Sequence, residues 1–231
     1  MDPGAGLSSR PDNPEVALPA LYERLHAYWG NLGWWPAESP FEVIVGAILT
    51  QNTAWQNVEK AVTALKREAV LSPARIRDLS EDRLAEWIRP AGYYRLKARR
   101  IKAFIRFLYE RYAGNLDRMF AQPTERLREA LLSVNGIGPE TADSILLYAG
   151  EKPVFVVDAY TKRILCRHGM IPEDADYPTL QGLFMRYLPA EAPLFNQYHA
   201  LLVHTGKTFC RKKPLCAGCP LEPLVGPGEA R

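Results

Sequence analysis

The sequence lacks the features that would place it in a membrane or outside the cell. Its 231 residues contain no run of about 18 apolar residues, so no segment is expected to span a bilayer. The first residues have neither a basic start nor an apolar stretch, which argues against a signal peptide. Only four cysteines occur, and in a reducing compartment these indicate metal or thiol chemistry before disulfides. We therefore expect a cytoplasmic monomer with no membrane partner.

Extremes of charge and composition are also missing. Apolar residues make up 47% of the chain and charged residues 24%, as in an ordinary globular protein. The formal net charge of +3 permits an anionic partner without demonstrating one. The class of the protein must therefore come from the distribution of its motifs.

Alternating strand patterns are absent, whereas helical spacing of apolar residues recurs along most of the chain. The spacing begins with Val16, Leu18 and Leu21, and the apolar run 41–50 continues into an amphipathic stretch, which favours two helices over a strand. Residues 152–158 are predicted to be an extended connector. The sequence therefore predicts an all-α fold, with further helices over 80–89, 95–112 (strongly basic) and 123–134.

A turn with two glycines joins two amphipathic segments at residues 135–138. Pro139 suits the first position of the second helix, because its missing N–H would be unpaired there. We expect Gly136 and Gly138 to supply positive φ angles and a close backbone approach, and Ile137 to hold the turn to the core. The outward N–H groups would then suit a phosphate. A plain capped helical hairpin is the alternative.

Asp158 ends the 152–158 connector and precedes the helical pattern of 159–169. Aspartate is a favoured N-cap residue, and a cap contributes about 0.5–2 kcal/mol. Taken alone, Asp158 would be interpreted as an N-cap. Its position about twenty residues beyond the hairpin is the reason to consider a second role.

The hairpin and Asp158 together carry a family resemblance. The pattern LLSVNGIGPETADSILLYA, followed by an apolar stretch and VVD, resembles the helix-hairpin-helix (HhH-GPD) DNA glycosylases of the endonuclease III superfamily. The resemblance covers roughly residues 16–225 and includes SPFEVIVGAILTQNT and RPAGYYRLKARRI. It implies that the partner is double-stranded DNA that contains a damaged base, and that Asp158 is the catalytic carboxylate. It also implies DNA-backbone contacts by Gly136, Ile137, Gly138 and Thr141.

The same resemblance implies two helical domains that flank a DNA-binding cleft. A six-helix barrel with the hairpin would span 38–154. A second domain would combine 16–37 with 155–231, and a loose tail would occupy 1–15.

Glu140 stands where bifunctional relatives place the lysine that forms a Schiff base with the sugar. A carboxylate cannot do this chemistry, so the sequence favours a monofunctional glycosylase in which Asp158 stabilises an oxocarbenium-like sugar and orients water. The alternatives are a mismatch thymine or uracil glycosylase, a bifunctional endonuclease III-like glycosylase/AP lyase, and a non-catalytic helix-hairpin-helix module.

Aromatic residues in two loops are candidates for a base pocket that receives the flipped base. Together with Glu140, the segments WWP and LTQNT with an aromatic residue two positions on resemble the endonuclease III-like 3-methyladenine glycosylases, in which aromatics sandwich an alkylated purine. Core packing is the alternative for each aromatic. Gln51 and Asn52 occupy the place where the family inserts an amide into the DNA gap. The predicted pocket residues are Trp34, Trp35, Pro36 and Trp55.

The spacing Cys210-x5-Cys216-x2-Cys219, with Arg211, Lys212 and Lys213 in between, resembles the family's [4Fe–4S] loop. The basic residues would face DNA phosphates. The family's fourth cysteine is missing, since Val225 stands near its place, and Cys166 is the remaining candidate. Zinc with a ligand among His168, His199 and His204, or a loop without metal, is the alternative.

Overall fold

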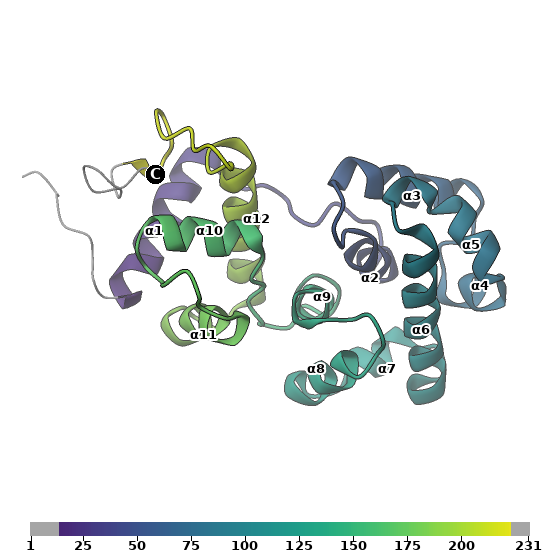
Figure 1. The fold of residues 1–231 in the computed structure, drawn as a ribbon. Coiled ribbons are helices and arrows are strands. Elements are labelled where there is room, and N and C mark those ends of the chain that lie inside the picture. Colours follow the sequence, from purple (N-terminus) through teal and green to yellow (C-terminus); the bar gives the residue numbers. More distant parts are fainter. Residues whose placement is uncertain (1–13, 223–231) are drawn as a thin grey trace, which may run out of the picture. The chain divides into compact units, whose positions relative to one another are not determined.

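The computed structural model describes residues 14–222. Over these residues every regular element is helical and no strand occurs, which confirms the predicted all-α class (Figure 1). None of the described helices is long and apolar enough to cross a bilayer. The chain forms two compact units: a central unit of residues 35–154 and a terminal unit that combines 14–34 with 155–222.

The central unit packs around one buried helix. This helix, α2, is capped by the Ser39 hydroxyl, which accepts from the Glu42 amide, and Pro40 occupies its first position. It contacts α3, α6, α9 and η2, so apolar side chains are buried on all its faces and the helical interpretation of this run is confirmed. The helices of this unit are α2 (Pro40–Leu49), α3 (Trp55–Arg67), α4 (Pro73–Asp78), α5 (Glu81–Trp87), η1 (Arg89–Ala91), α6 (Tyr94–Tyr112), α7 (Leu116–Phe120), α8 (Thr124–Leu132), α9 (Pro139–Ser144) and η2 (Ile145–Ala149).

The hairpin between α8 and α9 has one left-handed glycine. Gly136 has a φ of +87°, whereas Gly138 has a φ of −91° and a ψ of 178°. The expectation of positive φ at both glycines was therefore wrong for Gly138, because a residue before proline is driven toward extended backbone. Ile137 is buried in the core of the unit, as predicted. Helix α9 passes into η2, a short π-helical turn.

The terminal unit brings the two ends of the chain together. Helix α12 contacts both α1 and α10, and the Tyr198 hydroxyl donates to the Leu18 carbonyl at 2.8 Å. The Phe155 and Phe184 rings stack at 3.7 Å, so the middle of the extended connector 152–158 is anchored in this core. The helices of this unit are α1 (Pro14–Trp29), α10 (Ala159–Arg167), α11 (Tyr177–Tyr187) and α12 (Ala192–Thr208).

Helix α1 begins at Pro14, so the last two residues of the predicted loose tail are helical. Pro14 is its first residue and Glu15 lies in its first turn, positions that both residue types favour. The remainder of the predicted tail, residues 1–13, lies outside the described residues.

Candidate active site

Asp158 is the N-cap of α10, which confirms its predicted capping role. Its Oδ1 accepts from the Thr161 amide at 2.7 Å and from the Thr161 hydroxyl at 2.9 Å. Its Oδ2 lies 3.9 Å from Nε2 of His199 on α12. The carboxylate is thus held in one orientation by one oxygen, and the other oxygen faces an imidazole.

His199 is a residue that the sequence interpretation did not connect to Asp158. The side chain is buried, and burial lowers the pKa of the imidazole. The negative charge of Asp158 acts in the opposite direction, and the positive charge of Lys207 lowers the pKa further. The imidazole beside Oδ2 is therefore neutral at neutral pH.

The loop after α2 is joined to the hairpin through Gln51. Its Nε2 donates to the Gly136 carbonyl at 3.0 Å and to the Thr141 hydroxyl at 2.9 Å, while its Oε1 accepts from Arg100. The Thr141 side chain is consequently buried. Asn52, in contrast, is exposed and has a left-handed φ of 53°. The two neighbouring amides therefore have different surroundings, with Gln51 bound to the hairpin and Asn52 at the surface.

Lys97 on α6 holds the same loop from beneath. Its ammonium is almost completely buried and donates to the Leu49 carbonyl at 2.8 Å and to the Ala91 carbonyl at 2.7 Å. Burial, with a contribution from the charge of Arg100, lowers the pKa of Lys97 to about 8. Leu49 and Ala91 are the last residues of α2 and η1. By donating to their carbonyls, Lys97 fixes the start of the loop that follows each helix.

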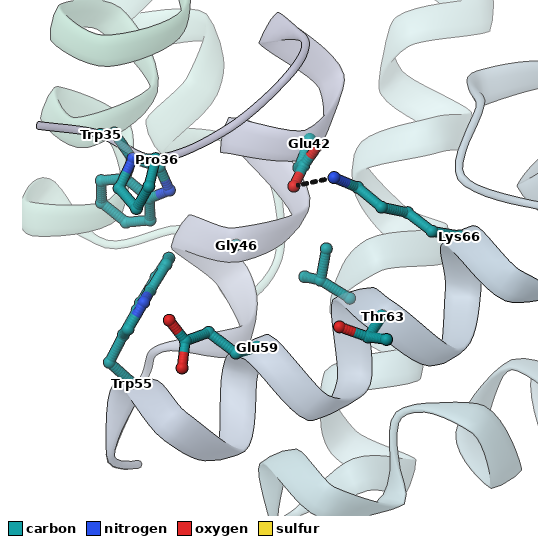
Figure 2. Close-up of a pocket in the computed structure, with 9 residues that line it drawn as sticks. Trp35, Pro36, Glu42, Gly46, Trp55, Glu59, Thr63 and Lys66 are labelled. Carbon is teal, nitrogen blue, oxygen red and sulfur yellow. Dashed lines mark ion pairs between the residues drawn. The ribbon is translucent and has the colours of Figure 1, made fainter. Parts of the chain in front are cut away.

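Three of the four predicted pocket residues line one pocket in the central unit: Trp35, Pro36 and Trp55 (Figure 2). The Trp35 ring meets Trp55 edge-on at 4.9 Å, and Gly46 lies beneath it, where a Cβ would come within 3.2 Å of the ring. The pocket is completed by Glu42, Gly46, Glu59, Val62, Thr63 and Lys66.

Trp34, the fourth predicted pocket residue, belongs to the terminal unit. There the Lys207 ammonium lies 5.7 Å from the centre of its ring, within the range of a cation–π interaction. The paired tryptophans are thus divided between the two units, as expected for neighbours that cannot both face one core.

Glu140 is exposed and is the second residue of α9. An acidic side chain in the first turn is favourable for the helix dipole. The position therefore has a carboxylate at the start of the second hairpin helix, and no amine that could form a Schiff base.

The three C-terminal cysteines are half-buried and carry free thiols. Burial raises the pKa of the Cys219 thiol, and the charges of Cys216 and Cys210 raise it further. Within residues 14–222, however, no three His, Cys, Asp or Glu side chains have an arrangement that could hold a metal ion. The thiols therefore do not form a complete ligand set, and the position of Val225 lies outside the described residues.

Two arginines of α10 hold the loop that carries these cysteines. Arg163 donates to the Cys210 carbonyl at 2.6 Å, and Arg167 donates to the Cys210 sulfur at 3.3 Å. Arg167 also donates to the carbonyls of Arg211 and Lys212, at 2.6 and 2.9 Å. The helix that begins at Asp158 therefore fixes the loop backbone, and the side chains of the basic residues 211–213 are exposed.

A model of the HhH-GPD superfamily of base excision DNA repair proteins matches residues 45–190. This match includes the Gln51 loop, the hairpin and Asp158. The chain belongs to the HhH-GPD superfamily.

Several superfamily proteins are similar over most of the chain. A protein of Methanocaldococcus jannaschii, provisionally named a DNA repair glycosylase, is 50% identical over 204 residues, which are 87% of this chain and 92% of that protein. Endonuclease III of Thermotoga maritima is 30% identical over 184 residues, covering 79% of this chain and 81% of the enzyme. The structure of the H. pylori 3-methyladenine DNA glycosylase bound to 1,N6-ethenoadenine is 28% identical, has a TM-score of 0.71, and is matched over 84% of this chain and 97% of that one.

Proposed function

We propose that this superfamily member is a monofunctional DNA glycosylase that flips an alkylated purine, such as 3-methyladenine, and hydrolyses its N-glycosidic bond. The observation that carries the proposal is the orientation of Asp158. One of its oxygens is fixed by Thr161, and the other is directed toward the neutral His199. A carboxylate held in this way is oriented before any substrate arrives.

The chemistry assigned to Asp158 follows from the charge that develops during base loss. As the N-glycosidic bond breaks, the departing base takes the bonding electron pair and the sugar becomes oxocarbenium-like. A fixed negative charge stabilises this transition state more than the neutral ground state. The same carboxylate can orient the attacking water and accept its proton. A cationic alkylated base is a good leaving group, so no general acid on the base is required.

The monofunctional part of the proposal rests on Glu140. A Schiff base with the sugar needs an amine, and the exposed carboxylate at this position supplies none. Water is then the nucleophile, and the product is an intact strand with an abasic site.

DNA binding is assigned to the hairpin and to the cysteine loop. The turn of residues 136–138 leads into α9, at whose start no side chain forms a capping hydrogen bond with the backbone N–H groups. Arg211, Lys212 and Lys213 add exposed positive charge. Both groups would bind the phosphate backbone of DNA. Such contacts position the duplex without reading its sequence. Asn52, exposed beside the bound Gln51, is the better placed of the two amides for the gap left by the flipped base.

The substrate class rests on the aromatic pocket. Trp35, Pro36 and Trp55 offer flat apolar surfaces that suit a purine, and Trp34 is the fourth residue assigned to the same base. The similarity to a protein named 3-methyladenine DNA glycosylase supports an alkylated purine.

The cysteines are assigned to a [4Fe–4S] cluster with a structural role. Cys210, Cys216 and Cys219 would supply three thiolates, and their spacing in the sequence supports this assignment. The fourth ligand is not assigned, and Cys166 is the one further cysteine in the sequence. Iron and sulfide analysis of mildly purified protein tests the assignment. Stoichiometric zinc would replace it with a mixed cysteine and histidine site, and metal-free active protein would remove it.

A panel of duplexes, each with one lesion, tests the function as a whole. We expect release of free 3-methyladenine or 7-methylguanine, an abasic but uncut strand, and no borohydride-trapped adduct. Release of thymine or uracil from mismatches would support the mismatch alternative, and efficient trapping would contradict the monofunctional assignment. Binding without release of any base would leave a DNA-binding module. Asp158→Asn protein serves as the inactive control.

A further inference from the structure

One wall of the aromatic pocket carries a carboxylate that no sequence motif indicated. Glu59 follows Trp55 by four residues on α3, so the two side chains lie on the same face of the helix, one turn apart. Figure 2 shows the Glu59 carboxylate beside the Trp55 ring, on the side of the pocket. A base stacked on Trp55 would therefore lie near a negative charge.

The other charges that line the pocket neutralise one another. The Lys66 ammonium lies 2.8 Å from Glu42 and 2.9 Å from Glu38. Glu42 is buried and also accepts from the Glu38 amide at 3.1 Å. Hydrogen bonding to Glu42 raises the pKa of Lys66, so the ammonium stays charged and compensates Glu42. For Glu59, in contrast, no ion pair is found within residues 14–222, and its negative charge remains available to a ligand.

Two tryptophan rings and one uncompensated carboxylate favour a flat cation. The faces of indole rings attract positive charge, and a carboxylate within a few ångströms adds a Coulomb term that is weakly screened once the base excludes water. We infer that Glu59 is a specificity-determining residue that makes this pocket prefer purines carrying a positive charge, such as N7-methylguanine or N3-methyladenine nucleotides, over neutral modified purines. The inference rests on the proposed function, whose substrate class it narrows.

Single-turnover excision tests this inference with one cationic and one neutral lesion. N7-methylguanine is the cationic substrate and 1,N6-ethenoadenine the neutral one, each in the same duplex context. At enzyme concentrations below saturation, where the rate includes capture of the flipped base, Glu59→Gln should lower the rate for the cationic base by about tenfold, the size expected for one charge in a partly solvated site, while the rate for the neutral base changes less than about twofold. Glu110→Gln removes an exposed carboxylate from α6 as the matched control and should change neither rate. An unchanged ratio of the two rates in Glu59→Gln protein overturns the inference.

A binding measurement separates failure of this inference from failure of the proposed function. Calorimetric titration with 1-methyladenosine, a cation at neutral pH, and with uncharged adenosine should show several-fold tighter binding of the cation to the unmodified protein only. Lesion excision with an unchanged rate ratio leaves the glycosylase function intact and removes the role of Glu59. If no lesion is excised, the proposed function is wrong. If the two nucleosides then bind equally, or neither binds, the pocket's preference for a cation is also wrong.

Discussion

Two helix starts in this molecule solve the same problem in opposite ways. The first backbone N–H groups of any helix lack intrahelical partners and carry partial positive charge. At α10 the Asp158 carboxylate occupies them, whereas at α9 Gly138 contributes no side chain. One start therefore has a side-chain cap and the other has none, and under the proposed function a DNA phosphate binds at the uncapped start. If the proposed function is correct, catalysis and DNA binding in this protein are both built from helix ends, and the cap residue decides which of the two a helix end serves.

The largest effect is expected when the negative charge of Asp158, the N-cap of α10, is removed while its capping hydrogen bond is kept. Asp158→Asn should lower the single-turnover rate of base release by about 100- to 1,000-fold, because the lost charge acts on the transition state. Asparagine caps as well as aspartate, so thermal stability and DNA affinity should hardly change. Excision within a few-fold of the unmodified protein would remove Asp158 from the chemistry and leave it a cap only.

The open start is tested by adding a side chain to it. A Cβ at Gly138 meets nothing within 4 Å, and its φ of −91° suits any residue, so Gly138→Val should fold normally. Its affinity for damaged and undamaged duplexes should fall equally, by roughly tenfold, because a branched side chain blocks the approach of the phosphate backbone. Fluorescence anisotropy at several salt concentrations measures this. A loss confined to damaged DNA would contradict a backbone contact.

Gly136 is the contrasting hairpin position. Its φ of +87° disfavours any side chain, and a Cβ there would collide with Arg100. Gly136→Val should therefore lower the free energy of unfolding by about 1–3 kcal/mol, unlike Gly138→Val. Denaturant titration of both variants makes the comparison, and equal stability of the two would contradict the assigned backbone conformations.

A smaller effect is expected at the far end of α10. Arg167→Met keeps the length of the side chain but removes the donors to the Arg211 and Lys212 carbonyls. DNA affinity should fall by a few-fold and the salt dependence should become shallower, since the basic loop is held less firmly. Excision from fully bound DNA should persist, because Asp158 at the other end is unchanged. An equal loss of the excision rate on bound DNA would show that the loop contributes to the chemistry.

The smallest effect concerns pH and His199. Burial lowers the pKa of His199 in the folded protein, so below about pH 6.5 the unfolded chain binds a proton that the folded protein does not. Stability should therefore decline as the pH falls from about 6.5 toward the lowered pKa, and it should be unaffected above that window. His199→Gln should flatten this decline in thermal unfolding between pH 7 and 5. An unchanged slope would assign the decline to other groups, His204 among them.

Local signals predicted much of what was found. The apolar spacing identified the helices of residues 41–50 and 55–68, and the Asp158 cap was visible because the capped amide lies three residues away. Glu59 could also have been found, since it follows Trp55 by one helical turn. The conformation of Gly138 was predicted wrongly because the glycine was weighed and the following proline was not.

The sequence by itself determined the all-α class, the hairpin and the α10 cap, because each depends on residues within a few positions of one another. Tertiary structure alone decided that His199 faces Asp158, that Lys97 holds the carbonyl of Leu49, 48 residues away, and that Gln51 binds a hairpin 85 residues away. These contacts join donors and acceptors that are far apart in the sequence. The spacing of apolar residues does not show which helices pack together. Packing of the apolar faces brings the elements together, and the buried polar groups then bind the partners that this packing supplies.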